Sequence, residues 1–323
     1  MSFFDIKQCV YNAKRKVNNM ESTYAKIIKE ICKENDIELS SFSGDWVFLL
    51  KKDKKIKYIL SHQFDLNTAA VQGICKDKCA AADILKHHNI ACVEHVFFTT
   101  PTSGYLPKSG NTKQLLELLN KHTKLVCKPN EGTSGKNVFV VTNGGELEAA
   151  MSAVFESADS MAASPYYEIE KEYRIIVLDG VVKLVFSKEI PYLTGDGSSS
   201  LAQLILNNSP QSLPVGASAM DLGQVLDDGE IWKYGWKHNL AHGAVAHVVN
   251  DKALIGSLSD LAIAASNALN IRFASIDIIR TKDGFRVLEI NSGVMMEHFA
   301  SSSDENYAKA KEIYKEAIGL MFA

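Results

Sequence analysis

Three oxygen-bearing side chains near the end of the chain, Asp277, Glu289 and Asn291, lie in two apolar segments that have the pattern of a hairpin. Glu289 and Asn291 are two residues apart, so both side chains leave the same face of a strand. If the turn pairs Thr281 with Phe285, the antiparallel register places Asp277 opposite Glu289. Two carboxylates this close repel each other unless a cation neutralises them. The pattern favours a magnesium site over a solvated hairpin face, because magnesium takes carboxylates and leaves positions for water and phosphates.

A second candidate site is the glycine-containing loop that follows Lys128. Glycines and small hydroxyl residues let backbone amides approach a polyphosphate, and lysines supply positive charge. The candidate contacts are Lys128, Gly132, Thr133, Ser134, Gly135 and Lys136. The spacing differs from a Walker A loop, since two residues and not four separate the glycines. Alone the loop fits an ordinary hairpin turn equally well, but together with the metal hairpin it favours a phosphate site.

The elements that must position these residues are helices mixed with antiparallel hairpins. This mixture predicts an α+β (mixed α/β) fold with several layers. Helices are expected at 10–35, 77–88, 112–121, 146–158, from about 201, at 254–270 and at 305–320. Strands are expected at 46–50, 56–60, 93–98, 125–128, 138–142, 167–178, 181–190, 273–279 and 286–291. The Asp179–Gly180 pair is a strong hairpin signal between two of these strands.

Length and charge limit the class of protein. A chain of 323 residues suggests two or three lobes. Its 35 Lys and Arg residues against 38 Asp and Glu residues give a net charge of -3, so we expect no binding to nucleic acid or to a membrane surface. No apolar run approaches the roughly 18–20 residues of a membrane span. Six scattered cysteines fit reduced thiols, so we expect a cytoplasmic protein.

Two residue pairs raise the alternative of a zinc site. Cys75 and Cys79 have no matching second pair. His238 and His242 have the spacing of zinc-binding helices, but Asn239 stands where a metalloprotease has its glutamate. Neither pair therefore favours zinc.

The order of six segments resembles an ATP-grasp ligase: KLVCKPNEGTSGKNVFVV, EKEYRIIVLDG, TGDG, WKHNLAHGA, SIDII and VLEINS. The similarity is to the branch that holds cyanophycin synthetase, the glutathione-forming ATP-grasp modules and the ribosomal-protein glutamate ligase. It covers about residues 76–292. The resemblance implies an N-terminal α/β domain at 1–75 and an ATP-grasp domain at 76–323. Within the latter, a middle lobe (about 110–165) and a C-terminal lobe (about 166–323) would grip ATP.

The resemblance also implies roles for individual residues. The implied ATP contacts are Lys78, Lys128, the loop residues 132–136, Lys237, Glu172 at the ribose, and Tyr167 and Glu168 at the adenine. The implied catalytic residues, which would hold transferring phosphoryl groups, are Arg174, Lys188 and Asn239. Asp277, Glu289 and Asn291 would bind two Mg²⁺ ions, with Mn²⁺ as an alternative.

Two segments depart from the family pattern. The segment 165–171 is shorter than the usual adenine hinge and lacks its glycine. After Asn291 the family continues with a small residue, proline and glycine, whereas this chain has 292–298, SGVMMEH. Because that loop commonly lines the acceptor pocket, its contents bear on the substrate.

The activity that the resemblance implies is ATP-dependent carboxylate–amine ligation. An amide or peptide bond would form through an acyl phosphate on an amino acid or short peptide, with release of ADP and phosphate. The implied partners are small-molecule carboxylate and amine substrates and, at the family level, a second copy in a homodimer. The alternatives are a grasp-type small-molecule kinase and a non-catalytic nucleotide-binding module.

Overall fold

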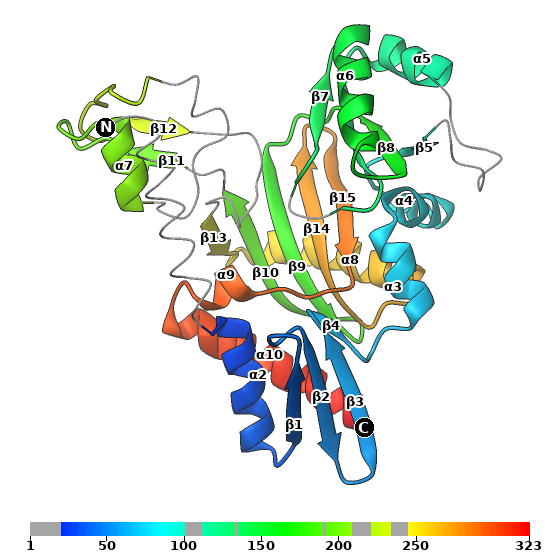
Figure 1. Ribbon diagram of the computed structural model, residues 1–323, viewed down its shortest axis with the longest axis vertical. Coiled ribbons are helices and arrows are strands. Elements are labelled where there is room, and N and C mark those ends of the chain that lie inside the picture. The colour runs from blue at the N-terminus through cyan, green and yellow to red at the C-terminus, as the bar shows by residue number, and fades with distance from the viewer. Residues whose placement is uncertain (1–20, 101–111, 133–134, 190–191, 209–220, 234–244) are drawn as a thin grey trace. The chain divides into compact units, whose positions relative to one another are not determined.

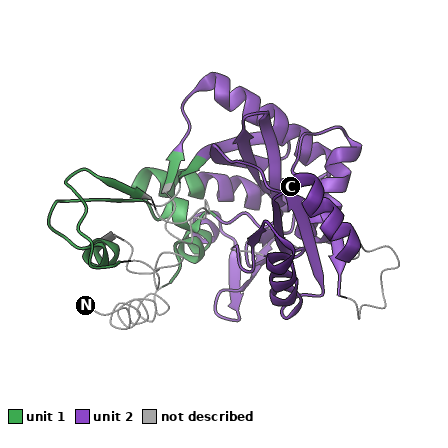
Figure 2. Ribbon diagram, turned by 90° about the horizontal axis from the view of Figure 1, so that it is seen from above, with its two compact units in different colours: residues 1–30, 187–247, 296–311 green, residues 31–186, 248–295, 312–323 purple. Residues whose placement is uncertain are grey.

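Figure 1 shows the computed structural model of the chain, in which residues 21–100, 112–132, 135–189, 192–208, 221–233 and 245–323 are described. The chain divides into two compact units (Figure 2). The smaller comprises residues 1–30, 187–247 and 296–311, and the larger comprises 31–186, 248–295 and 312–323. The lobe boundaries expected from the sequence stay a prediction.

The largest sheet has the strand order β13-β10-β9-β14-β15. Its strands are β9 (Lys171–Leu178), β10 (Val181–Glu189), β13 (Val245–Val248), β14 (Phe273–Thr281) and β15 (Gly284–Asn291). Asp179 and Gly180 connect β9 to β10, and both have left-handed backbone angles (φ 46° and 73°). Two such residues in succession form the turn that matches the twist of a tight hairpin, as the sequence predicted.

One face of this sheet forms the main core of the larger unit. It packs against α3 (Ala69–Lys76), α4 (Lys78–His87) and α8 (Lys252–Ala268). The alternate residues Tyr173, Ile175 and Val177 of β9 lie in this core. Because side chains alternate along a strand, the residues between them face the other side of the sheet.

A second sheet has the order β5-β8-β6-β7. It consists of β5 (Val96–Thr99), β6 (Leu125–Pro129), β7 (Phe139–Val141) and β8 (Ser160–Pro165), with α5 (Thr112–His122) and α6 (Gly144–Phe155) nearby. Its core contains residues from both helices and from the strands. The sequence did not predict β8, because the segment SMAASP has few strongly β-favouring side chains. Yet β8 is central, pairing with both β5 and β6.

The N-terminal sheet has the order β1-β2-β3-β4. It contains β1 (Glu38–Phe42), β2 (Val47–Lys52), β3 (Lys55–Leu60) and β4 (Gln63–Phe64). The β2–β3 hairpin confirms the prediction for residues 46–60. Its inner face buries Phe48, Leu50 and Ile59 completely.

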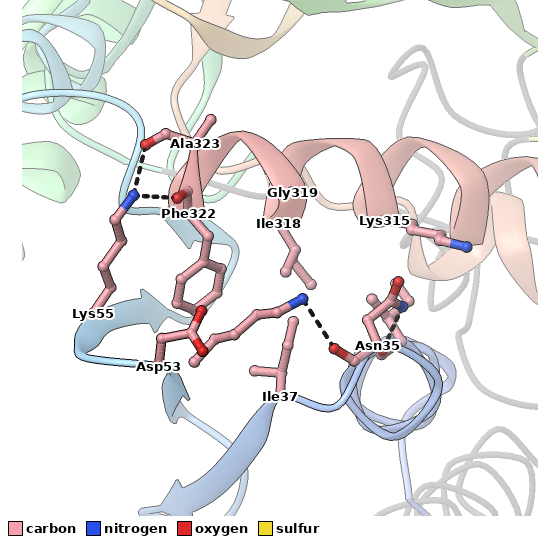
Figure 3. Close-up of a pocket in the computed structure, with 11 residues that line it drawn as sticks. Asn35, Ile37, Asp53, Lys55, Lys315, Ile318, Gly319, Phe322 and Ala323 are labelled. Carbon is pink, nitrogen blue, oxygen red and sulfur yellow. Dashed lines mark hydrogen bonds between the residues drawn. The ribbon is translucent and has the colours of Figure 1, made fainter.

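The helices α2 (Thr23–Glu34) and α10 (Asp304–Phe322) each cross the boundary between the two units. Within the larger unit, the end of α2, the hairpin tip and the end of α10 line an open cavity of about 340 Å³ (Figure 3). There the Lys55 ammonium donates hydrogen bonds to the carbonyls of Phe322 and Ala323. Among the described residues, no helix is long and apolar enough to span a membrane.

The smaller unit contains β11 (Tyr192–Thr194), β12 (Ile231–Lys233), α7 (Leu201–Asn208) and α9 (Glu297–Ala300). Leu193, Leu201 and Leu226 are among the residues of its apolar cluster. A side chain at Gly195 would place Cβ 2.1 Å from the Asp227 carbonyl oxygen, so only glycine fits there.

Candidate functional site

The β14–β15 hairpin pairs Asp277 with Glu289, as predicted, but through a different register. The expected pairing of Thr281 with Phe285 is wrong, since Thr281 pairs with Gly284. A β-bulge beside Asp277 corrects this offset. The extra residue on β15 is Leu288. It lies between Val287, which pairs with Ile278, and Glu289, which pairs with Asp277.

The charged side chains of three strands share one face of the sheet. Arg174 of β9 pairs with Asp277, which pairs in turn with Glu289. Glu172, two residues before Arg174, therefore lies on the same face, as does Asn291, two residues after Glu289. Glu172 and Asp277 are only 7% and 5% exposed, so this face carries buried charge.

Arg174 binds Asp277 through two parallel hydrogen bonds. Its Nε and Nη2 atoms donate to Oδ1 and Oδ2, each at 2.8 Å. Burial opposes the charged guanidinium, but Asp277, with Glu172 and Glu289 nearby, outweighs burial and raises the pKa of Arg174 above its ordinary value. A bidentate pair of this kind fixes both side chains, so Arg174 holds the orientation of Asp277.

Lys128 of β6 supplies a buried positive charge beside this face. Burial lowers the pKa of Lys128 to about 8, although the carboxylates of Glu289 and Glu172 act in the opposite direction. The charge of Lys78 lowers the pKa of Lys128 further, because the two ammonium groups lie close enough to repel each other. An anion bound between them would relieve that repulsion.

Lys78, the first residue of α4, connects this helix to the predicted phosphate loop. Its ammonium donates to the carbonyls of Asn130 (3.2 Å) and Gly132 (3.0 Å). The side-chain oxygen of Asn130 accepts from the backbone amide of Cys79 (3.1 Å), and Asp77 caps the helix by accepting from the amide of Ala80. The start of the loop is therefore fixed to the first turn of α4. No local pattern in the sequence predicts that Asn130 makes this connection.

Sequence reasoning also missed His95. Both ring nitrogens are buried without a hydrogen-bond partner of normal geometry. Burial, with Lys128 and Lys78 nearby, holds the pKa of His95 well below its ordinary value, so the ring is neutral. Together with Lys78 and Glu289, His95 lines a narrow crevice. Only its placement in three dimensions distinguishes this histidine from the others in the chain.

Comparisons with known proteins identify the fold that carries this arrangement. Residues 229–314 match the family model of the RimK-like ATP-grasp domain. The structure is similar to that of a bifunctional glutathione synthetase from Pasteurella multocida, with a TM-score of 0.58 and 16% identity over 92% of this chain and 44% of that one. It is also similar to a D-alanine–D-alanine ligase from Bacillus anthracis, with a TM-score of 0.53 and 19% identity over 80% of this chain and 69% of that one. The chain has the ATP-grasp fold.

Sequence relatives of this ATP-grasp chain are longer than it is. A probable alpha-L-glutamate ligase from Shewanella pealeana is 24% identical over 247 residues, 76% of this chain and 42% of the relative. A cyanophycin synthetase from Trichormus variabilis is 30% identical over 89 residues, 27% of this chain and 10% of the relative. The chain thus spans about two fifths of the glutamate ligase. The resemblance expected from the ordered segments is confirmed.

The remaining residues predicted for the ATP-grasp site are placed as follows. Tyr167 is partly buried, with the Arg286 guanidinium 5.4 Å from its ring centroid, and burial raises its pKa. Glu168 is exposed beside it. In the loop, Gly132 and Lys136 are exposed and Gly135 has a φ of 66°. Lys188 is buried in β10 but belongs to the smaller unit. Thr133, Ser134, Lys237 and Asn239 lie outside the described residues.

The residues on the charged face fit a magnesium ion by their chemistry. Across the described ranges, no group of three or more His, Cys, Asp and Glu side chains has the arrangement of a metal site. Asp277, Glu289 and Asn291 instead offer two carboxylates and one amide, a set of oxygen donors that suits a metal sharing its coordination with phosphates. Both Asp277 oxygens accept a hydrogen bond from Arg174. Each carboxylate oxygen has two lone pairs, so these two bonds alone do not exclude a metal.

Proposed function

We propose that this chain is an ATP-dependent carboxylate–amine ligase acting on an amino acid or short peptide. The observation that carries the proposal is the buried charged face in an ATP-grasp fold, where Glu172, Arg174, Asp277 and Glu289 lie beside Lys128. Buried ionisable groups cost desolvation free energy, and clusters of them are typical of functional sites. The names of the glutamate ligase and glutathione synthetase relatives are consistent with this activity.

The proposed reaction has two steps. A carboxylate oxygen of the first substrate attacks the γ-phosphorus of ATP, and the bond to ADP breaks, which gives an acyl phosphate. The amine nitrogen of the second substrate then attacks the acyl carbon, phosphate leaves and the nitrogen loses a proton. No covalent bond to the protein is needed. Positioning and charge stabilisation therefore carry the catalysis.

The residues of the charged face would have different roles in this reaction. Lys78 and Lys128 would bind the phosphates, since both are cations that repel each other in the free protein. Glu172 would accept hydrogen bonds from the ribose hydroxyls. Asp277, Glu289 and Asn291 would hold Mg²⁺ or Mn²⁺. When bound, this ion would neutralise part of the phosphate charge. Arg174 would keep Asp277 oriented through its two hydrogen bonds, and would add positive charge for the γ-phosphate.

We place this activity in the cytoplasm and assign it small-molecule carboxylate and amine substrates. The cysteines of the described chain, Cys32, Cys75, Cys79, Cys92 and Cys127, are all free and buried, which is compatible with a reducing compartment. The relatives' names suggest amino acids or peptides as substrates. Lys188 and Asn239 stay predicted contacts of the transferred phosphoryl group, and Lys237 stays a predicted ATP contact.

The deciding experiment measures ADP and phosphate release from ATP and Mg²⁺ with a panel of amino acids and dipeptides, and identifies the products by mass spectrometry. The proposal expects a pair of substrates that stimulates ADP release and gives a product lighter than their sum by one water. A product that retains the phosphoryl group would identify a kinase instead. ATP binding without ADP release in the presence of any pair would identify a non-catalytic module.

A further inference from the structure

The imidazole of His95 holds polar atoms that the folded chain leaves unpaired. Its ring nitrogens Nδ1 and Nε2 are both buried, although the residue as a whole is only partly buried, and neither makes a hydrogen bond of normal geometry. Across the described residues, no other side chain leaves two buried polar atoms in this state. Buried polar groups are nearly always hydrogen-bonded, and an unpaired one destabilises the fold. Two of them on one ring indicate a candidate contact for a ligand.

His95 lies at the passage between the two sheets of the larger unit that carry the candidate site. The segment before it lies along β15, where it makes two backbone hydrogen bonds of 2.9 Å each with Val287. Directly after it, β5 begins and pairs with β8 of the second sheet. The chain therefore passes from the strand that carries Glu289 to the sheet that carries Lys128, and His95 lies at this crossing.

The neighbours of the ring are charged groups that we propose for ATP and its metal ion. Lys78 and Glu289 line the same narrow crevice as His95. Burial lowers the pKa of His95 well below its ordinary value, and the charges of Lys128 and Lys78 lower it further, so the ring is neutral. All four residues belong to the larger unit. The imidazole thus lies among the groups proposed to bind the triphosphate.

The chemistry of a neutral imidazole determines which ligand can pair with it. One ring nitrogen carries an N–H donor and the other is an acceptor. Lysine ammonium groups only donate, so Lys78 and Lys128 can satisfy the acceptor nitrogen but not the N–H. The N–H needs an oxygen acceptor, and Glu289, the carboxylate in the crevice, makes no hydrogen bond of normal geometry to it. Phosphate oxygens are such acceptors, and the two lysines attract a phosphate to this place.

We propose that His95 is a further ATP-binding residue, whose ring N–H donates a hydrogen bond to a phosphate oxygen of the nucleotide. This role rests on the proposed function, since it takes Lys78 and Lys128 as the phosphate ligands. A neutral donor adds a hydrogen bond without adding a third positive charge to two lysines that already repel each other. Because the bond forms only with nucleotide, His95 weakens the fold of the free chain and strengthens the complex. A residue that only supports the fold would stabilise both.

The test measures the ATP affinity and the thermal stability of the full chain together. His95→Leu replaces the ring by an apolar side chain without unpaired polar atoms, so the melting temperature of the free chain should stay the same or rise. Its ATP dissociation constant, measured by titration calorimetry with Mg²⁺, should rise at least about tenfold, which corresponds to the loss of one hydrogen bond to a charged group. His87→Leu is the matched control, because His87 is exposed at the end of α4, and it should leave the affinity unchanged.

Two conservative variants test whether ATP needs a donated hydrogen bond at this position. The side chains of Asn and Gln carry an amide N–H donor close to the positions of Nδ1 and Nε2, respectively. His95→Asn or His95→Gln, whichever matches the donating nitrogen, should recover most of the affinity that His95→Leu loses. Inorganic tripolyphosphate should show the same loss of affinity with His95→Leu, whereas adenosine should not.

The outcomes distinguish this role from the proposed function. If the unmodified chain binds no ATP, the proposed function fails and His95 loses its role with it. If the unmodified chain binds ATP and His95→Leu binds it equally well, only the role of His95 is overturned. A His95→Leu chain that loses affinity and also melts several degrees lower would show that the ring supports the fold, which would overturn the proposal. An affinity for adenosine that falls while that for tripolyphosphate is unchanged would assign the ring to the base or ribose, and would overturn it too.

Discussion

Two sheets of the larger unit each bury one apolar face, but their opposite faces carry different chemistry. The β9–β14–β15 sheet turns charged side chains into a place that water barely reaches, with Asp277 only 5% exposed. The N-terminal sheet turns apolar side chains such as Tyr58 toward water. Both arrangements cost free energy in the isolated chain. Under the proposed function a charged ligand offsets the first cost, so the comparison distinguishes a buried face suited to a charged ligand from an exposed apolar face.

The largest effect should come from removing one carboxylate of the charged face. Glu289→Ala should lower kcat at least about 1,000-fold, because the charge of the transferring phosphoryl group would lose part of its stabilisation. Turnover is followed as ADP release, and a thermal melt checks that the fold is intact. Glu148→Ala, an exposed carboxylate on α6, is the control and should have normal turnover. Near-normal turnover of Glu289→Ala would remove this residue from the proposed metal site.

The buried and exposed Arg–Asp pairs of the larger unit allow a matched test of stability. Arg174→Met leaves the Asp277 carboxylate buried without its partner and should lower the free energy of unfolding by about 3–5 kcal/mol. Arg272 binds Asp179 with the same two-bond geometry, but its side chain is 44% exposed. Arg272→Met should therefore cost only about 1 kcal/mol or less. Urea unfolding of both variants measures the difference, and equal losses would show that burial of the first pair has little effect.

A smaller effect should appear in the pH dependence of ATP binding. With a pKa of about 8, Lys128 is mainly charged below pH 8 and loses its charge above it. Bound phosphates favour the charged form, so the ATP dissociation constant should rise by up to about tenfold per pH unit above 8. Titration calorimetry at pH 7, 8 and 9 measures this change. Lys128→Arg keeps its charge over that range and should remove the dependence; an unchanged dependence would assign it to another group.

The smallest effect should come from the exposed face of the N-terminal sheet, opposite the face that buries Phe48. Tyr58→Lys should change the free energy of unfolding by no more than about 0.5 kcal/mol, since the side chain is already half exposed. Phe48→Ala on the inner face of the same sheet should cost about 3–5 kcal/mol. A large loss for Tyr58→Lys would mean that this exposed face supports the fold of the chain.

The sequence predicted the fold class, the main hairpins and the pairing of Asp277 with Glu289, because alternating apolar residues and Asp–Gly turns are local signals. It could not predict the Arg174–Asp277 pair, which joins residues 103 positions apart. It also missed β8, whose position is set by its two neighbouring strands and not by its own residues. No local pattern in the sequence distinguishes His95, because Lys78 and Lys128 come near its ring only in the folded chain.

The bulge in the β14–β15 hairpin determines which deletion the chain should tolerate. Val287 faces the core and Glu289 faces the charged side, although residues two apart in a regular strand share one face. Leu288 is the extra residue that allows this, and without it Ile278 would still pair with Val287 and Asp277 with Glu289. Its deletion should therefore leave every facing pair unchanged. What Leu288 contributes is one wall of the crevice beside Lys78 and His95.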